Sequence, residues 1–278
     1  MRYIKAILST THIDSHNQRM TITALESAVK QISTSYIPVG IEHDPRIPPT
    51  GRIISAHIEP MEDGEHALVG VIEVFEAGDK IAYKDDRAGI PIRTRNTGCL
   101  QIEYDRTFNS PEDQQLISEM GIILNTESVE ELKKSVDPIS VLVLAGTFLI
   151  GAIASGFLEA IGTEGYEAIK SRIKKLLNNR KDNGQERLFV FKATIEKHGQ
   201  NIEIQTVLSN PTDEDIDYFL ENGSKEIDRL VDLALASDNK LRRVVFEYSE
   251  GNFSIKFGVR ADAVPLFPVE DVKTRTND

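Results

Sequence analysis

Three side chains near the start of the chain have the types and the spacing of metal ligands. His12, Asp14 and His16 alternate along an extended segment, so all three fall on the same side of it. Imidazole and carboxylate groups together suit Zn²⁺ or Mn²⁺. A polar turn with exposed histidines is the alternative interpretation of the same residues. No glycine-rich phosphate-binding motif occurs, and the sequence predicts no organic cofactor.

A second pattern surrounds His43. His43, Asp44 and Pro45 end a strand-like segment, and Gly51 and Arg52 begin the next one after a proline-rich turn. This arrangement resembles the tailed-phage prohead maturation proteases, a family with a β-barrel-like fold shared with the herpesvirus assembly proteases. The resemblance covers roughly residues 4 to 108.

The resemblance implies a general base and leaves the nucleophile in question. It makes His43 the base, since imidazole titrates near neutral pH. Gln101 stands where the family has its serine, and glutamine is not a nucleophile. Cys99 lies two positions earlier, on the same strand face, and its thiolate is the alternative nucleophile. The resemblance therefore favours a degenerate, non-catalytic copy, with a peptidase using His43 and Cys99 as the alternative.

Composition excludes several function classes. The 278 residues include 44 acidic and 32 basic side chains, and the net charge of −12 argues against binding to nucleic acid. A single cysteine cannot form an internal disulfide, and the first residues lack the apolar core of a secretory signal. These features predict a cytoplasmic protein, with attachment to the inner membrane as a further expectation.

The elements that position these residues indicate an α+β fold. Residues 1–137 contain several alternating segments and predict a mainly antiparallel β domain with short helices. Thr23 and Glu26 have the spacing of a capping box, which places a helix over residues 24–32. The pattern of residues 183–278 predicts a ββαββ domain followed by a polar tail. This second domain is expected to form a four-stranded antiparallel sheet with helices on one face.

The segment 138–182 between these domains has the most unusual composition. Residues 139–158 carry no charge over a length that spans a hydrocarbon core when helical. As a helix, this segment has a face of small side chains suited to membrane insertion or self-assembly, formed by Thr147, Gly151, Ala152, Ser155 and Gly156. The alternative is a buried helix in a protein that does not enter a membrane.

A basic amphipathic helix is expected directly after the apolar segment. Its cationic face, formed by Lys170, Arg172, Lys174 and Lys175, is typical of helices that lie on anionic lipid. A solvated lysine-rich face is the ordinary alternative.

Together these patterns predict a non-catalytic binding protein. Its expected partners are membrane lipid or further copies of itself, engaged through residues 139–158, together with an unidentified protein. A phage- or defence-related effector fits this description. The alternatives are the peptidase described above and a soluble protein-interaction module.

Overall fold

The fold was analysed in a computed structural model of the chain. It describes residues 2–13, 19–40, 44–76, 81–92, 100–124, 129–131, 139–148, 153–181, 186–249 and 251–266. The described part is a mixed α+β structure with two sheets, which confirms the predicted fold class at that level. Two compact units can be distinguished. Unit 1 comprises Met1–Pro91 and Val259–Leu266, and unit 2 comprises Ile92–Gly258 and Phe267–Asp278.

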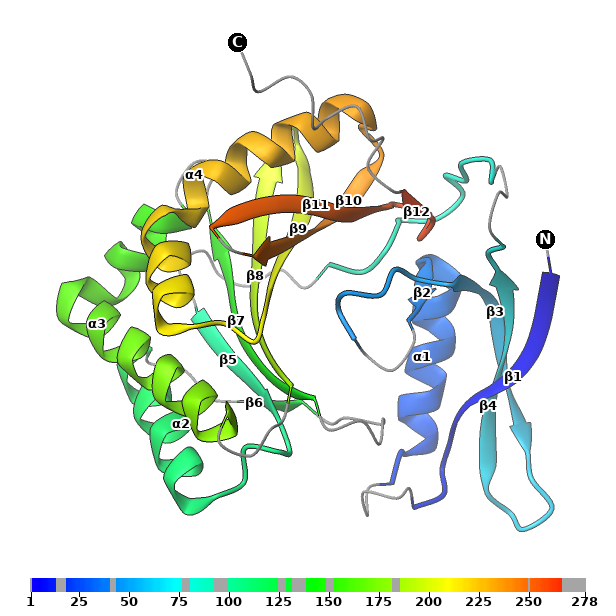
Figure 1. The fold of residues 1–278 in the computed structure, drawn as a ribbon. Helices are drawn as coiled ribbons and strands as arrows, with labels where there is room; N and C mark the ends of the chain where they lie inside the picture. The colour runs from blue at the N-terminus through cyan, green and yellow to red at the C-terminus, as the bar shows by residue number, and fades with distance from the viewer. Residues whose placement is uncertain are drawn as a thin grey trace. The chain divides into compact units, whose positions relative to one another are not determined.

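Unit 1 contains a four-stranded sheet with one helix on it (Figure 1). The strand order is β1-β4-β3-β2, and every neighbouring pair is antiparallel, as expected for hairpin-connected strands. Gly64, with φ of 85°, closes the hairpin between β3 and β4. The strands are β1 (Arg2–Thr10), β2 (Ile37–Val39), β3 (Gly51–Pro60) and β4 (His66–Val74).

Helix α1 (Ile22–Thr34) supplies the core of this unit. Leu25 and Ile32 are buried and pack with Ile53 and Leu68 of the sheet. The helix begins earlier than the sequence predicted, because the side chain of Thr21, not that of Thr23, accepts a hydrogen bond from the Ala24 amide. The predicted capping box of Thr23 and Glu26 is therefore wrong, although the helix itself is confirmed.

The second sheet has eight strands in the order β12-β11-β10-β9-β8-β7-β5-β6. Residues 259–266, which include the end of β11 and all of β12, are grouped with unit 1. The strands are β5 (Leu100–Asp105), β6 (Val129–Glu131), β7 (Ser140–Phe148), β8 (Arg187–Lys197), β9 (Gln200–Ser209), β10 (Leu241–Ser249), β11 (Asn252–Arg260) and β12 (Pro265–Leu266).

This sheet contains both parallel and antiparallel strand pairs. The parallel pairs arise where a helix connects the two strands. β7 and β8 are parallel, as are β9 and β10, and a helix connects each pair. The helices α2 (Pro111–Ile123), α3 (Ile153–Lys181) and α4 (Asp213–Ser237) cover one face of the sheet (Figure 1). Gly162, with φ of 70°, divides α3 into two helices. The predicted four-stranded antiparallel ββαββ sheet is therefore wrong, because β9 and β10 are parallel and the sheet continues through β7 and β5.

The apolar segment 139–158 is not one helix. Residues 140–148 form β7, hydrogen-bonded to β5 on one side and β8 on the other, and a helix begins only at Ile153. Leu142 and Val143 point to opposite faces of the sheet, and each is 1% exposed. A strand buried on both faces is apolar at nearly every position, which explains the uncharged run at residues 140–148. In the described part of the chain no helix is long and apolar enough to cross a membrane, so the predicted transmembrane helix is wrong.

Candidate functional site

β1 is the most exposed strand of unit 1. It pairs with β4 alone and forms one edge of the four-stranded sheet. Tyr3 is 55% exposed and Ile7 is 60% exposed, and Ile4 is also exposed. A sheet edge with apolar side chains and unpaired backbone groups is a template for pairing with another chain.

Further apolar side chains are exposed close to β1 in the sequence. Of the nine exposed large apolar side chains in the described residues, six fall between residues 3 and 22: Tyr3, Ile4, Ile7, Ile13, Met20 and Ile22. The Ser9 hydroxyl lies 2.9 Å from the Met20 sulfur, which brings Met20 to the end of β1. Grouped exposed apolar side chains mark interaction surfaces, whereas scattered ones need no explanation.

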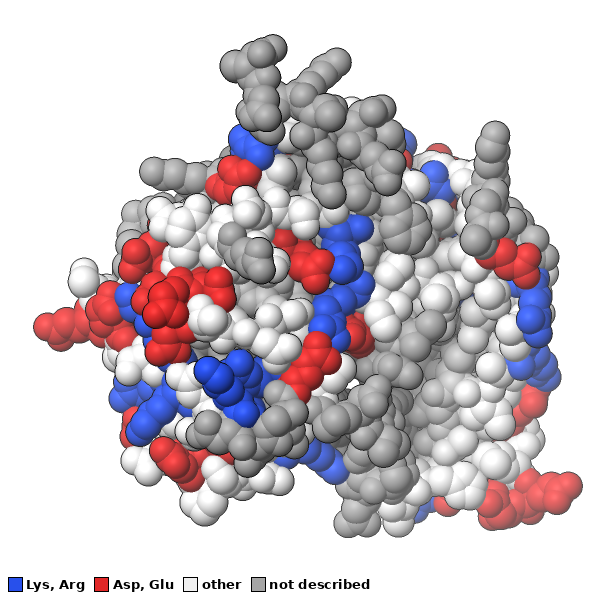
Figure 2. All heavy atoms as spheres, viewed as in Figure 1, with Lys and Arg blue, Asp and Glu red and all other residues white. Residues whose placement is uncertain are grey.

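The two ends of this edge carry opposite charges. Arg2 and Lys5 lie on β1, and Lys5 pairs with Glu59 of β3 at 2.8 Å. At the other end the strand continues to Thr11, whose hydroxyl donates to Glu65. Figure 2 shows basic side chains along the right-hand margin, with acidic ones close above and below them, and further acidic ones at the lower right tip.

The Glu65 carboxylate at the acidic end has a lowered pKa. The Thr11 hydroxyl and the Arg19 guanidinium, 2.6 Å away, both hydrogen-bond the Glu65 carboxylate and lower its pKa. His12 pairs with Asp63 at 3.1 Å in the same hairpin turn. The strand edge therefore runs from a basic start to an acidic end.

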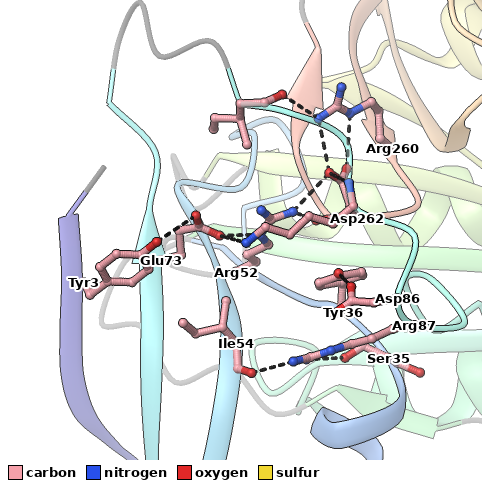
Figure 3. Close-up of polar contacts among 12 residues, drawn as sticks. Tyr3, Ser35, Tyr36, Arg52, Ile54, Glu73, Asp86, Arg87, Arg260 and Asp262 are labelled. Atoms are coloured by element: carbon pink, nitrogen blue, oxygen red, sulfur yellow. Dashed lines mark hydrogen bonds and ion pairs between the residues drawn. The ribbon is translucent and has the colours of Figure 1, made fainter.

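A buried ion network lies beside β1 in unit 1 (Figure 3). Arg52 of β3 is 0% exposed. Its Nε donates to Glu73 at 2.7 Å, and its Nη1 donates to the backbone carbonyl of Asp262 at 2.7 Å and lies 3.1 Å from the Asp262 carboxylate. A buried guanidinium is tolerated only when such partners surround it.

Further residues extend the network from both sides. The Tyr3 hydroxyl donates to Glu73 at 3.4 Å, which ties β1 to it, and the Lys84 ammonium lies 3.4 Å from the same carboxylate. Arg260 donates to Asp262 at 3.2 Å. Burial alone would raise the pKa of Glu73, but the hydrogen bond and charge of Arg52 outweigh it, so the pKa lies below its ordinary value.

Tyr36 forms the second centre of this network. The guanidinium groups of Arg52 and Arg87 lie 5.2 Å and 4.9 Å from the centre of its ring. Its hydroxyl donates to Asp86, and burial together with that carboxylate raises the pKa of Tyr36. Arg87 also donates to the backbone carbonyls of Ile32 and Ile54, at 2.7 Å and 2.6 Å. The network thus holds the helix end, the sheet and residues 260–262 together, and its chemistry is that of a structural clamp.

The structure describes few of the predicted catalytic and metal residues. His43, Cys99, Asp14 and His16 lie outside the described residues, so the peptidase pair stays a prediction. His12 contacts Asp63, as given above. Within the described ranges no group of three His, Cys, Asp or Glu side chains is placed to hold a metal ion.

The predicted lipid-binding cations have acidic partners from the neighbouring helices. Lys170 and Lys174 pair with Asp217 of α4 at 3.5 Å and 2.6 Å, and Arg172 and Lys175 pair with α2. Burial raises the pKa of Tyr166, which lies under Lys170, to about 12. The cationic face of α3 thus lies between two acidic helices and serves helix packing.

The predicted small-residue face is not assembled as one surface. Thr147 belongs to β7 and pairs with Thr194 of β8. Gly151 and Ala152 lie outside the described residues. Ser155 and Gly156 fall within α3. Of the residues expected to share one helical face, Thr147 is therefore in a strand, whereas Ser155 and Gly156 are in a helix.

Comparison with known proteins identifies no family for this chain. No protein-family model, no curated protein and no solved structure matches this chain significantly. The resemblance to prohead proteases consequently gains no support, and the phage-related description has none.

Proposed function

We propose that this chain is a non-catalytic protein-binding protein that takes an extended segment of another polypeptide onto the free edge of β1. The observation that carries the proposal is the exposure of Tyr3, Ile4 and Ile7 on a strand that pairs on one side only. In strand addition, backbone hydrogen bonds provide affinity and alternate side chains provide selectivity. Assembly through residues 139–158 has no comparable support, because residues 140–148 form a central strand.

The ion network supports this role by fixing the sheet that presents the edge. β1 is joined to the network by the hydrogen bond from Tyr3 to Glu73, and Glu73 is held by Arg52. A binding strand held in place before the partner arrives loses less conformational entropy on binding. The ion network therefore holds β1 in place, and the exposed edge of β1 binds the partner.

Selection from a random peptide library against the full chain tests the proposal. We expect enriched peptides rich in β-branched and aromatic residues, with dissociation constants on the order of 10 µM, as for small transient interfaces. Ile7→Asp should weaken their binding at least about fivefold, because it replaces the exposed apolar side chain that these apolar peptides would contact.

Ile122→Asp is the matched control, since Ile122 is 77% exposed but lies on α2. It should leave peptide binding unchanged. The proposal fails when no peptide is enriched, or when Ile7→Asp and Ile122→Asp bind the enriched peptides equally well.

A further inference from the structure

We infer that the partner at this edge is a second copy of the chain, paired antiparallel through β1 about a two-fold axis at Ala6. This inference rests on the proposed function and names its partner. The strand has nine residues, Arg2–Thr10, and a β-bulge between Ile7 and Ser9 ends its regular part. A two-fold axis at Ala6 pairs residues 5–7 within the regular part of both copies and places the bulge residue Leu8 opposite Ile4 at each end of the interface.

The register follows from the side chains. With Ala6 opposite Ala6 of the second copy, Ile4 lies opposite Leu8 and Lys5 lies opposite Ile7. Residues opposite each other in an antiparallel pair point to the same face, so these contacts are direct. The aliphatic stem of Lys5 can cover the exposed Ile7 while its ammonium stays in water. A register centred on Lys5 would instead put two ammonium groups opposite each other.

Charge complementarity also favours a second copy over an unrelated strand. In this register Arg2 lies near the end of the other copy's strand, beyond the bulge, where Thr11 binds Glu65. The basic start of each strand therefore meets the acidic hairpin of its neighbour, twice by symmetry. No ion pair of Arg2 within the chain is seen among the described residues, so its guanidinium is available.

The size of the seam sets the expected affinity. Five opposed residue pairs span about 17 Å of strand, which is short compared with the interface of a stable dimer. The flanking Ile13, Met20 and Ile22 add exposed apolar area near one end. We therefore expect a reversible dimer with a dissociation constant on the order of 10 µM.

Analytical ultracentrifugation of the full chain over a concentration series tests the dimer. The decisive variants change the charge of residue 7 while removing the same apolar side chain. Ile7→Lys puts two ammonium groups opposite each other twice in the dimer, and should raise the dissociation constant at least about tenfold. Ile7→Glu faces the same Lys5 with opposite charge, and should dimerise as well as the unchanged chain or better.

Cysteine cross-linking tests the register independently, in a Cys99→Ser background. Ala6→Cys should form an intermolecular disulfide, because directly opposed residues lie about 4.5 to 5.5 Å apart between Cα atoms, within disulfide range. Lys5→Cys is the matched control. In this register the two residues 5 are diagonal neighbours, about 7 to 8 Å apart, and should not cross-link.

The outcomes separate this inference from the proposed function. A chain that stays monomeric at 200 µM while binding selected peptides overturns the dimer and leaves the proposed function standing. Dimers that form equally with Ile7→Lys, or that cross-link through Lys5→Cys and not through Ala6→Cys, also overturn it. A monomer that binds no peptide overturns both.

Discussion

β1 and β7 are strands of equal length in two different sheets, and their surroundings are opposite. Each has nine residues, and each is rich in aliphatic side chains. β7 has a hydrogen-bonded neighbour on both sides and buries Leu142, whereas β1 has one neighbour and exposes Ile7. Apolar content therefore does not decide whether a strand is buried. Its place in the sheet decides this, and that place is set by segments far away in the sequence.

The two sheets also differ in how charge is used. In unit 1 an arginine and two carboxylates are fully buried within the structure that carries β1. In unit 2 the pairs of Arg172 with Glu119 and of Lys174 with Asp217 are partly exposed and lie between helices, although Arg180 of α3 and Asp113 of α2 form one buried pair. Buried pairs are costly to break, while exposed ones contribute little. The variants below test the difference between buried and partly exposed ion pairs.

The largest expected effect is at Arg52. Arg52→Met removes the cation that faces Glu73 and Asp262, and leaves their buried carboxylates without it. We expect a loss of about 3 to 5 kcal/mol in the free energy of unfolding, measured by urea denaturation. Arg172→Met, which breaks a partly exposed pair with Glu119, should cost less than about 1 kcal/mol. Equal losses of stability for the two variants would contradict the contrast between the buried and the partly exposed pair.

The next largest effect contrasts the two strands directly. Leu142→Ala in β7 should cost about 2 to 5 kcal/mol, because it leaves a cavity in a close-packed core. Ile7→Ala in β1 should change stability by no more than about 0.5 kcal/mol, since the side chain is already in water. Chemical denaturation of both variants at a concentration where the chain is monomeric provides the comparison. A cost of 2 kcal/mol at Ile7 would show that β1 is buried in the monomer.

Acid should weaken unit 1 through Glu73. Its pKa is below the ordinary 4.5 in the folded chain, so its contribution to stability is fully present above about pH 4.5. That contribution is lost as the pH falls through the folded pKa. Glu73→Gln should lower stability at pH 7 and flatten its dependence on pH below 4.5, as measured by denaturation at several pH values. An unchanged pH dependence would contradict the assigned direction.

The smallest effect is expected on α3. Lys174→Ala breaks the pair with Asp217 at 2.6 Å, but both side chains retain access to water. We expect a loss of about 0.3 to 1 kcal/mol, which 1 M salt should largely abolish by screening. Binding of the unchanged chain to anionic vesicles, lost in this variant, would contradict the helix-packing role given to the cation.

Local signals predicted much of the secondary structure. The alternating segments at residues 52–58 and 188–196 are strands, and Pro111 begins a helix with Ser110 as its cap. Asn222 and Gly223 have the residue types of a turn and indicate a break in the helix, but α4 is continuous there. A Cβ on Gly223 would come within 3.0 Å of Phe219 and 3.1 Å of Phe253. That glycine permits close packing and does not end a helix.

The pairing between distant segments could not be predicted from the sequence. Residues 139–158 have the length and composition of a membrane helix, and only the positions of β5 and β8 show that residues 140–148 are a central strand. The composition of residues 3–8 is typical of a strand, but it does not show that this strand is an edge. Arg2 and Lys5 on an otherwise apolar strand were the available signal, since charged side chains are common on sheet edges.

The hydrogen bond from Arg52 to Asp262 joins residues 210 positions apart, yet both belong to unit 1. During translation the guanidinium emerges long before its carboxylate, so the first 91 residues cannot reach their final state until residue 262 has left the ribosome. A fragment that ends at residue 258 should consequently aggregate or be degraded, whereas one joining residues 1–91 to residues 259–266 by a short linker should fold.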